Sequence, residues 1–559
     1  MGKFTTLRAN LLRAVRTLSH REWFGFMTLV FIALLSMLVL AGAAYRLHTV
    51  ETPSSGGTLH EGFIGSPNII NPVLSNTDID QSVSTLVFSG LMRLDPETRT
   101  YTPDLAEGYT LSEDEKTYTF ILKDNLVFHD NTPISTQDIA LTIELVQNRS
   151  VESPLFTRWQ GVQVDVINEK TISFTLENKY GEFLQNTTLG ILPHHIWSQI
   201  PTDQIEKAST LEFPIGSGPF KVHNIERDST GIITRIDMKR FKSFALGTPY
   251  LKKVELLFFP NESKLIKALN KNNIDRAIAL SPQSLEELSK DIKISTHPLS
   301  RIFSLFINTS ENEALKEKEV RELLEKMIDK EDLISTSLNG FGIPANSPLP
   351  SYTPTEEKFL VSVEDFIENS KKISLNEEGT VLYDSKPISF TISTADTNEL
   401  VSGAEYIKEK LSPYGINVTL AVFETGTLTQ EIIRTRRYEV LLFGQIIQQY
   451  SDLFAFWHSS QRNDPGLNIA LLTDSDLDTT LEKFVETSNE EERKKLLEKI
   501  HTSITEDTRT IFLYQPELIM GEQKNLTSHN SKYTFINNSS ERLINIYKEF
   551  KRTHRKWKQ

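Results

Sequence analysis

One short stretch of the chain gathers side chains that could bind a ligand, hold a metal or close a core. Residues 448–461, QQYSDLFAFWHSSQ, contain four aromatic residues, one histidine and one carboxylate in fourteen positions. The apolar residues follow neither the period of a helix nor the alternation of a strand. The stretch itself therefore leaves all three roles open.

The motifs of the common catalytic sites are missing from the sequence. There is no HExxH, no GxSxG and no GxxxxGK[ST] loop, so metalloprotease, hydrolase and nucleotide-binding interpretations lack their usual signals. The cysteine count is zero, which excludes disulfides, thiolate metal sites, a cysteine nucleophile and a lipid-modified N-terminal cysteine. We therefore predict a protein that is not an enzyme, with no catalytic residue and no cofactor.

A possible calcium loop, DSDLD at residues 474–478, lacks its two decisive positions. The acids occupy the first, third and fifth places, but Thr479 stands where the loop requires Gly, and Val485 stands where it requires Glu. We expect instead a turn whose last acid caps a helix that begins near Thr479.

Three histidines are candidate metal ligands. His194 and His195 are adjacent, and adjacent residues on a strand point to opposite faces, so a shared metal would need irregular backbone. His458 lies beside Trp457, in a setting more typical of a packed or hydrogen-bonded core residue than of a ligand. The sequence therefore predicts no metal site, and a metal-complex receptor that uses His458 is kept as an alternative.

Charge is distributed unevenly along the chain. Of the 60 basic and 74 acidic residues, residues 47–540 hold 47 and 71, a net charge of -24, whereas both ends are basic. A body this acidic repels phosphate backbones, so no nucleic acid partner is expected. The basic tail KEFKRTHRKWKQ, residues 548–559, is expected to be a solvated helix end, with contact to anionic polymer or lipid headgroups as the alternative.

An uncharged apolar run occupies residues 23–45, WFGFMTLVFIALLSMLVLAGAAY. About 20 apolar residues cross a hydrocarbon core of about 30 Å, and the basic segment 1–22 favours a cytoplasmic N-terminus. A cleaved signal peptide is the alternative, because small residues at 41, 43 and 44 fit a cleavage site. We predict an uncleaved anchor, a flexible linker over 46–58, and an extracellular body.

Strand-like and helix-like patterns alternate along that body, which predicts an α/β fold. KTYTFILK and TISFTLE alternate as half-buried strands, and between them Ser135 and Asp138 form a capping-box-like helix start. Further on, a helical stripe over 400–411 precedes the strand INVTLAVF, and a helix over 490–504 precedes the strand TIFLY.

Several longer patterns then follow one another in a familiar order. They are SPNIINPVLSNTDIDQSVSTLVFSGLMRLD, YTPDLAEGYTLSEDEKTYTFILKDNLVFHDNTPISTQDI, EFPIGSGPFKV, GTPYLKKVELLFFPNESKLIKALNKNNID, the region from YEVLLFG to FWHSSQ, and LNIALLTDSDLDTTLEKF. Together they cover most of residues 59–550, and the chain resembles the family 5 extracellular solute-binding proteins, the peptide/nickel-type receptors of ABC importers.

The resemblance implies a two-lobed, periplasmic-binding-protein-like α/β fold of type II, the large peptide-binding class, preceded here by one transmembrane helix. The implied boundaries are a first lobe over 59–295 with an inserted subdomain at about 97–210, a second lobe over 296–505, a return to the first lobe over 506–545, and a basic tail over 546–559. Such receptors enclose their ligand by hinge closure.

The resemblance also implies where the ligand lies. Peptide-binding members carry an acid in the loop after the strand VLLFG, which pairs with the ligand's free amino terminus. Here Gln449 stands at that place, and an amide cannot neutralise an ammonium group. Asp452 is the alternative carboxylate, while Phe454 and Phe456 are expected in the core. The candidate ligand-binding residues are Ser89, Phe443, Gln445, Gln448, Gln449, Tyr450, Asp452 and Trp457.

We therefore expect a monomeric extracellular receptor that captures an oligopeptide or similar polar solute and delivers it to the membrane permease subunits of an ABC transporter. The departure at Gln449 leaves room for a blocked peptide, a cell-wall fragment or a saccharide. Two other functions stay open: a metal-complex (nickel-type) receptor, and an envelope sensor or chaperone without transport.

Overall fold

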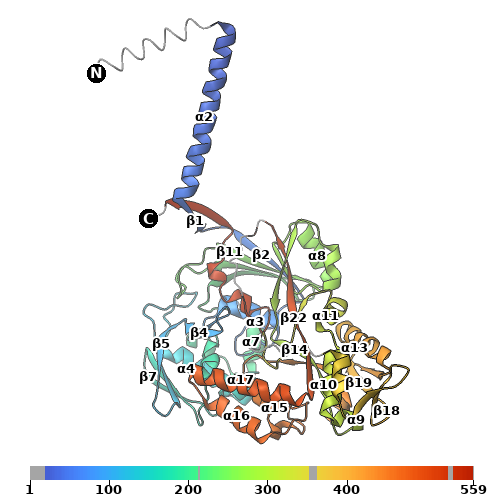
Figure 1. Cartoon of the computed structure of the whole chain (residues 1–559). Helices are drawn as coiled ribbons and strands as arrows, with labels where there is room; N and C mark the ends of the chain where they lie inside the picture. Colours follow the sequence, from blue (N-terminus) through green and yellow to red (C-terminus); the bar gives the residue numbers. More distant parts are fainter. Residues whose placement is uncertain (1–18, 212–213, 352–361, 525, 527–532, 558–559) are drawn as a thin grey trace.

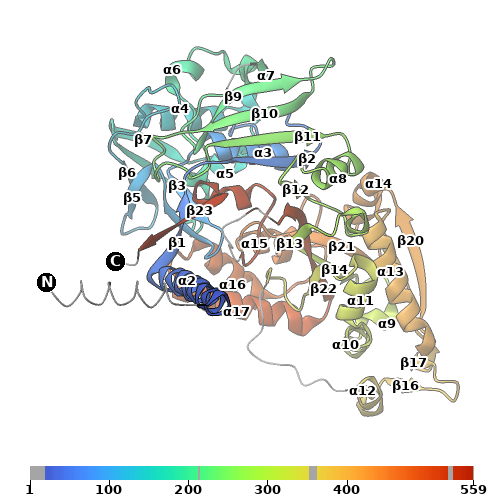
Figure 2. The same ribbon diagram turned by 90° about the horizontal axis from the view of Figure 1, so that it is seen from above.

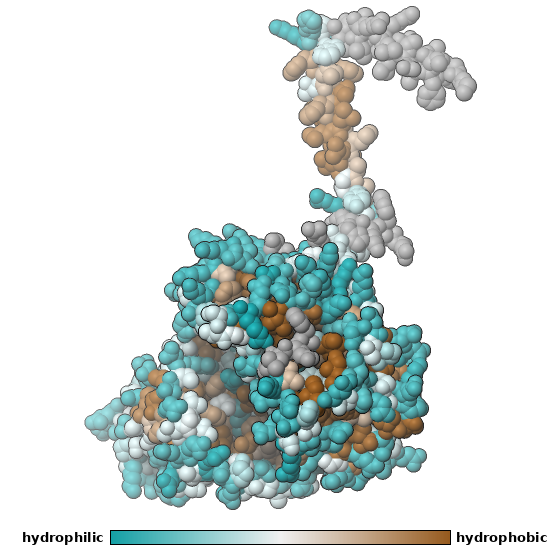
Figure 3. All heavy atoms as spheres, turned by 180° about the vertical axis from the view of Figure 1, so that it is seen from behind, coloured by the Kyte–Doolittle hydropathy of each residue, from teal (hydrophilic) through white to brown (hydrophobic). Residues whose placement is uncertain are grey.

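A computed structural model describes residues 19–211, 214–351, 362–524, 526 and 533–557. It shows one long helix, α2 (His20–His48), that stands off a large α/β body (Figure 1). The most apolar part of this helix has a mean hydropathy of 2.5, and no other described part of the chain covers it (the brown column in Figure 3). Its length and composition fit a single membrane span or a signal sequence.

The segment after α2 is paired backbone, which corrects two predictions. Strand β1 (Thr49–Ser54) pairs antiparallel with β23 (Arg552–Trp557) over six residues. The predicted flexible linker is therefore reduced to residues 55–57, between β1 and β2. The predicted helical end of the basic tail is wrong, because the tail finds backbone partners on β1 and extends as a strand.

The body is organised on two groups of strands that share β22 (Thr510–Gln523). One group, in spatial order, is β20 (Asn417–Phe423), β19 (Ser389–Ala395), β21 (Val440–Ile446) and β14 (Arg301–Ile307). The other is β12 (Arg276–Ile278), β2 (Thr58–Ile64), β11 (Lys253–Phe259), β10 (Ile233–Arg240) and β9 (Phe220–Arg227). Figure 2 shows the two groups on opposite sides of the molecule.

Each group has its own hydrophobic core, and β22 contributes to both. Its first half, including Phe512 and Tyr514, packs with residues of the β14–β21 side. Its second half, including Leu518 and Met520, packs with residues of the β2–β11 side. The buried hydrophobic residues of the two sides thus form separate clusters, as a two-lobed α/β protein requires.

A second crossing runs beside β22. Strand β13 (Ile292–Pro298) pairs with the second half of β22, and β14, which follows it directly, pairs with the first half. At the junction the Leu299 N–H donates to the Pro516 carbonyl at 2.9 Å, and the Gln515 side chain donates to the Leu299 carbonyl at 2.6 Å. In the described part of the chain, these adjacent extended segments carry the sheet from one side to the other.

A four-stranded antiparallel sheet is inserted after β4 (Thr100–Pro103). Its order is β5 (Ala106–Leu111), β6 (Thr117–Leu122), β8 (Thr171–Thr175) and β7 (Gln163–Asn168). Helix α4 (Thr136–Gln147) lies between β6 and β8 in the chain and begins with the predicted capping box of Ser135 and Asp138. The two strands and the helix expected here are confirmed.

Three helices on the β14–β21 side test the remaining sequence patterns. Helix α13 (Asn398–Leu411) precedes β20, and α17 (Glu490–Asp507) precedes β22, as expected. Helix α16 (Ser475–Glu486) begins four residues earlier than predicted. Asp474, the first acid of DSDLD, caps it by accepting from the backbone of residues 476 and 477, because its side chain reaches these free N–H groups.

Candidate ligand-binding cavity

A cavity of about 460 Å³ lies where the inserted sheet, the first core and the second core meet. It is lined from α3 (Asp78–Val87), β3 (Met92–Asp95), α5 (Phe156–Trp159), η2 (Phe183–Thr188), residues 537–544 and Gln448. Gln448 follows β21, so the second core contributes to the wall. The volume is in the range of pockets that hold small-molecule ligands, about 300–1,000 Å³.

Three arginines line the cavity, and two of them are neutralised. Arg93 pairs with the buried Asp104 at 2.7 Å. Arg99 pairs with Glu541 at 2.6 Å and lies over the Phe535 ring. Burial raises the pKa of Glu541 above its usual value in spite of this partner. These two ion pairs hold the cavity wall in place, and Arg93 and Arg99 therefore add little net charge to it.

The third arginine, Arg158, has a different setting. It is exposed, and its Nη2 donates to the neutral Oε1 of Gln448 at 2.8 Å. Among the described residues, no carboxylate oxygen lies within 4.0 Å of its guanidinium. Arg158 therefore retains a positive charge at the cavity wall that a ligand can reach.

Much of the remaining wall is made of hydroxyl and amide groups. Ser89 Oγ, Gln185 Oε1 and Asn537 Oδ1 are buried without a hydrogen-bond partner within the described part of the chain. Buried polar atoms are normally paired, because an unmet hydrogen bond costs about 1–3 kcal/mol. Their concentration around one cavity marks it as a place built for polar contacts.

The loop after β21 closes one side of the cavity by reaching the inserted subdomain. Tyr180 Oη donates to Gln449 Oε1 at 3.2 Å, while the Gln449 amide donates to Asp452 at 3.2 Å. Asp452 also accepts the backbone N–H groups of Gln448 and Gln449 at 3.0 and 3.1 Å, and burial raises its pKa. Both candidate groups for an amino terminus are thus engaged within the protein.

Further contacts join the same two parts of the chain. Glu182 accepts from the backbone N–H of Ser451 at 3.1 Å and forms an ion pair with Arg493 of α17. The Gly181 N–H donates to the Val485 carbonyl at 2.9 Å. Together with the Arg158 and Tyr180 contacts, these bonds bridge the inserted subdomain and the second core, so the structure shows the two sides closed on each other.

The structure separates the sequence-predicted residues into three groups. Ser89 and Gln448 line the cavity. Gln449 and Tyr450 lie in the adjoining loop and Asp452 is the first residue after it; the Tyr450 ring packs 6.5 Å from the Phe535 ring across the interface. Phe443, Gln445 and Trp457 lie away from the cavity wall, with Gln445 buried and Phe443 packed on the second core.

Trp457 requires a correction as a cavity residue. It is 1% exposed and packs 6.1 Å from the Phe512 ring in the second core. The reason is helical: α15 (Asp452–Trp457) buries Leu453 and Trp457, which are four residues apart and share one face. Residues 448–461 therefore form a loop, the short helix α15 and a further short helix over residues 459–461, so no single period runs through the stretch.

Sequence reasoning missed Arg93, Arg99, Arg158 and Tyr180. They come from separate elements of the inserted region and its neighbours, with no common motif. The one hint in the sequence is that arginines are scarce in an acidic body. Their scarcity does not predict which arginines lie close together in the fold.

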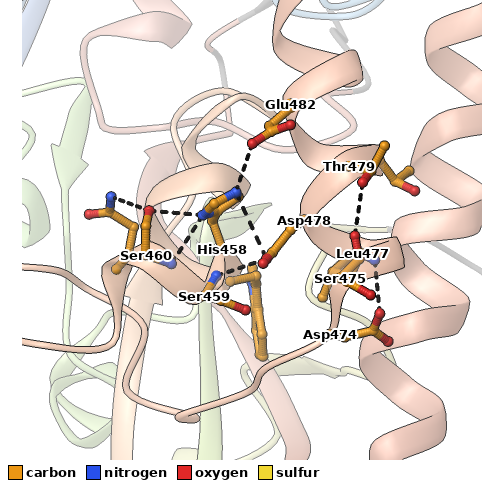
Figure 4. Close-up of polar contacts among 12 residues, drawn as sticks. His458, Ser459, Ser460, Asp474, Ser475, Leu477, Asp478, Thr479 and Glu482 are labelled. Carbon is orange, nitrogen blue, oxygen red and sulfur yellow. Dashed lines mark hydrogen bonds and ion pairs between the residues drawn. The ribbon is translucent and has the colours of Figure 1, made fainter.

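The histidines considered as metal ligands have protein partners. His195 Nε2 lies 2.8 Å from a carboxylate oxygen of Asp130, and the backbone N–H of His194 donates to Asp138 at 2.7 Å. His458 accepts the Ser460 N–H at Nδ1 (3.1 Å), which leaves its Nε2–H for Glu482 at 3.4 Å (Figure 4). In the described ranges no group of three His, Cys, Asp or Glu is arranged to hold a metal ion.

Replacing His458 by Ala is expected to lower the free energy of unfolding by about 1–2 kcal/mol, without changing metal content. The imidazole caps η7 (Ser459–Gln461), links α15 to α16 and stacks 4.3 Å from Phe454. Chemical denaturation with elemental analysis checks both points. His458→Asn, which keeps a capping acceptor, should recover part of the loss, and a bound metal lost only in the Ala variant would contradict this structural role.

Two α/β sides joined by crossing strands, with a polar cavity between them, define a two-lobed solute-binding protein of the type II periplasmic-binding-protein class. The chain belongs to the bacterial extracellular solute-binding proteins, family 5, whose middle-region model matches residues 100–466. This assignment confirms the resemblance and the fold expected from the sequence.

The oligopeptide-binding protein AppA of Bacillus subtilis (strain 168) is 25% identical over 498 residues, which cover 85% of this chain and 89% of that protein. The structure of AppA from Bacillus subtilis in complex with a nonapeptide has a TM-score of 0.63, is 24% identical, and covers 90% of this chain and 100% of that one. The structure of NikZ from Campylobacter jejuni in complex with Ni(L-His) has a TM-score of 0.64 and is 24% identical. The match covers 88% of this chain and 99% of that one.

Proposed function

We propose that this chain is the extracellular receptor of an ABC importer, which encloses a short peptide or similar polar solute in the 460 Å³ cavity and delivers it to a membrane permease. The observation that carries the proposal is a polar cavity bridged by side chains from both cores. The similarity to a named oligopeptide-binding protein over 85% of the chain supports a peptide ligand. The protein acts by binding and closure rather than by chemistry.

The proposed moving parts are the lobes expected from the sequence. Residues 59–295 and 506–545 form the first lobe, and residues 296–505 form the second. The separate cores and the paired crossing at β13, β14 and β22 support this division. Extended segments at such a crossing can absorb small backbone rotations, which is how hinge closure proceeds.

The ligand class follows from the wall. Unpaired oxygen atoms of Ser89, Gln185 and Asn537 accept hydrogen bonds, as amide N–H or hydroxyl groups would supply them. Arg158 offers one positive charge for a carboxylate. Because Gln449 and Asp452 are engaged with each other, recognition of a free ammonium is not the main source of affinity in this site.

For the anchor, we infer that α2 is retained, with its N-terminus in the cytoplasm and the body outside. The uncharged apolar run over residues 23–45 is longer than the apolar core of a signal peptide, about 7–15 residues, and basic residues precede it. The receptor is proposed to act as a monomer beside its permease. With no cysteine for lipid attachment in the sequence, α2 is proposed as the tether.

Native mass spectrometry of the purified full-length chain tests the function directly. A bound peptide or comparable polar solute, released on denaturation and rebound on refolding, is the expected result. Only metal complexes, or no solute from cells grown on peptide-rich medium together with no binding of a random peptide library, would overturn it. The intact mass of the same sample reports whether α2 is still attached.

Replacing Arg158 by Gln is expected to weaken binding of peptides with a free C-terminal carboxylate by about tenfold, the loss of one charge-assisted contact. The matched amidated peptides should bind equally to both proteins, because they carry no carboxylate for the guanidinium. Titration calorimetry with each peptide pair measures the difference. Equal weakening for acid and amide would show that Arg158 acts through the Gln448 contact instead.

A further inference from the structure

The segment that follows α2 and the C-terminal strand β23 meet at the foot of α2 (Figure 1). Helix α2 ends at His48, and β1 begins at the next residue and pairs with β23 in the register Thr49↔Trp557 to Ser54↔Arg552. Figure 1 shows this two-stranded ribbon running from the foot of α2 to the start of β2. We call residues 49–54 and 552–557 the tether ribbon.

The tether ribbon begins at the depth of the lipid headgroups if α2 spans the membrane. The apolar run of α2 ends at Tyr45, and Thr49 follows four residues later, about 6 Å along a helix axis. The headgroup layer on each side of the hydrocarbon core is of about that thickness. Trp557 is opposite Thr49 in the register, and tryptophan is enriched at this interface.

The ribbon differs in charge from the body that it carries. Strand β23 contributes Arg552, Arg555 and Lys556, and the one acid of the ribbon, Glu51, is the register partner of Arg555. The ribbon is therefore net positive, whereas residues 47–540 have a net charge of -24. A body this acidic is repelled by an anionic membrane within a Debye length of about 8–10 Å.

We propose that the tether ribbon is a membrane-contact element whose basic β23 strand binds the headgroups of anionic phospholipids around the outer end of α2. This proposal rests on the proposed retention of α2, which fixes the tether ribbon at the membrane surface. The partner is lipid because the surface it meets is set by the covalent connection to α2, and the positive charge complements anionic headgroups. This assigns a role to the basic tail that the solute-binding function leaves unused.

The contact has a consequence for the receptor. The ribbon continues directly into β2, a strand of the first lobe, and Gly57 in the connecting turn packs against Lys551. Because β1 and β23 are paired at the foot of α2, two strands instead of one flexible linker connect the first lobe to the helix. The first lobe is then fixed relative to the membrane, and the second lobe moves during closure.

The absence of cysteine allows a specific test in the full-length chain. A single cysteine at the exposed Thr553 of β23 carries a polarity-sensitive fluorophore, and the chain is reconstituted in nanodiscs of phosphatidylcholine with or without phosphatidylglycerol. A blue-shifted emission with phosphatidylglycerol, reversed by high salt, is expected. The same emission in both disc types overturns the proposal.

Charge variants assign the effect to the ribbon. The triple variant Arg552→Gln, Arg555→Gln and Lys556→Gln should lose the lipid-dependent shift, since each basic residue near such a surface is worth about fivefold in binding. The matched control, Lys371→Gln, Lys494→Gln and Lys495→Gln, removes the same charge from exposed positions of the body and should keep it. A shift that survives in the triple variant, or is lost equally in the control, contradicts the assignment.

A second readout separates this inference from the anchor proposal. Intact mass shows whether the chain still contains α2. If α2 is retained but the shift is absent, the lipid contact fails and the anchor stands. If α2 is cleaved, the anchor proposal fails, and the released chain is tested by flotation with phosphatidylglycerol vesicles, where the absence of charge-dependent flotation overturns the lipid contact as well. Peptide binding measured in the same samples reports on the solute-binding function independently.

Discussion

Replacing Glu61 by Gln is expected to lower the free energy of unfolding by about 3–5 kcal/mol. Glu61 of β2 is fully buried and accepts from Arg542 at 2.8 Å through both oxygens and from Arg276 at 2.7 Å. In this charged cluster the neutral variant leaves the buried Arg542 without an ion-pair partner among the described residues, whereas Arg276 keeps Glu522 at 2.8 Å and Glu549 at 3.4 Å. Urea denaturation, followed through the unfolding transition of the first lobe, measures the change in the free energy of unfolding.

The pH dependence of that loss has a definite sign. Burial acts to raise the pKa of Glu61, but the charges of Arg542 and Arg276 outweigh it and lower the pKa below its usual value. A lowered folded-state pKa gives stability that is present above the unfolded value, near 4.3, and is lost as the pH falls through the folded value. The difference between wild type and Glu61→Gln should thus stay constant from pH 7 to about pH 5 and shrink in stronger acid.

The control for this prediction is a solvent-exposed ion pair on the protein surface. Glu313 lies 2.6 Å from Lys316, but its side chain is 79% exposed. Glu313→Gln should have no measurable effect, because surface pairs gain little over hydration. An equally small effect at Glu61 would mean that the cluster does not hold the C-terminal segment onto the first lobe.

Replacing Gly181 by Ala is expected to weaken ligand binding by about 5- to 150-fold while leaving each lobe folded. A Cβ at this position would lie 2.1 Å from the Thr487 carbonyl oxygen, which belongs to the opposite side of the closed interface. Overpacking of this kind costs about 1–3 kcal/mol. The backbone of Gly181 is outside the left-handed region, so alanine is not strained within its own lobe. The cost therefore applies to the closed state alone.

Two measurements distinguish this effect from damage to the fold. Spin labels on cysteines introduced at the exposed Glu169 and Lys495 report the distance between inserted subdomain and α17, which should shift to longer values in the variant. The matched control, Gly108→Ala in β5 of the same inserted sheet, meets no atom within 4 Å and should bind as the wild type does. Unchanged affinity in Gly181→Ala would show that these contacts are not needed for closure.

Local patterns predicted the elements well where one signal dominated. The capping box at Ser135 placed α4, and the alternation in TISFTLE placed β8, because burial of one face imposes its period on the sequence. The helix at DSDLD was predicted too late, since three acids compete as caps and only the reach of Asp474 to free backbone groups selects one. The tail was predicted as a helix because its strand partner, β1, lies about 500 residues away.

The sequence by itself determined the class of protein: an apolar segment long enough to span a membrane, an acidic α/β body, no thiol chemistry, and a series of patterns that resemble one family. Each of these depends on composition or on neighbouring residues. Only the tertiary structure decided which polar groups share a cavity. Arg158, Gln448 and Ser89 come from three distant segments. Trp457 is buried in the second core because helix α15 places it on the same face as Leu453. These contacts between distant residues depend on how the lobes pack, and the local sequence does not predict them.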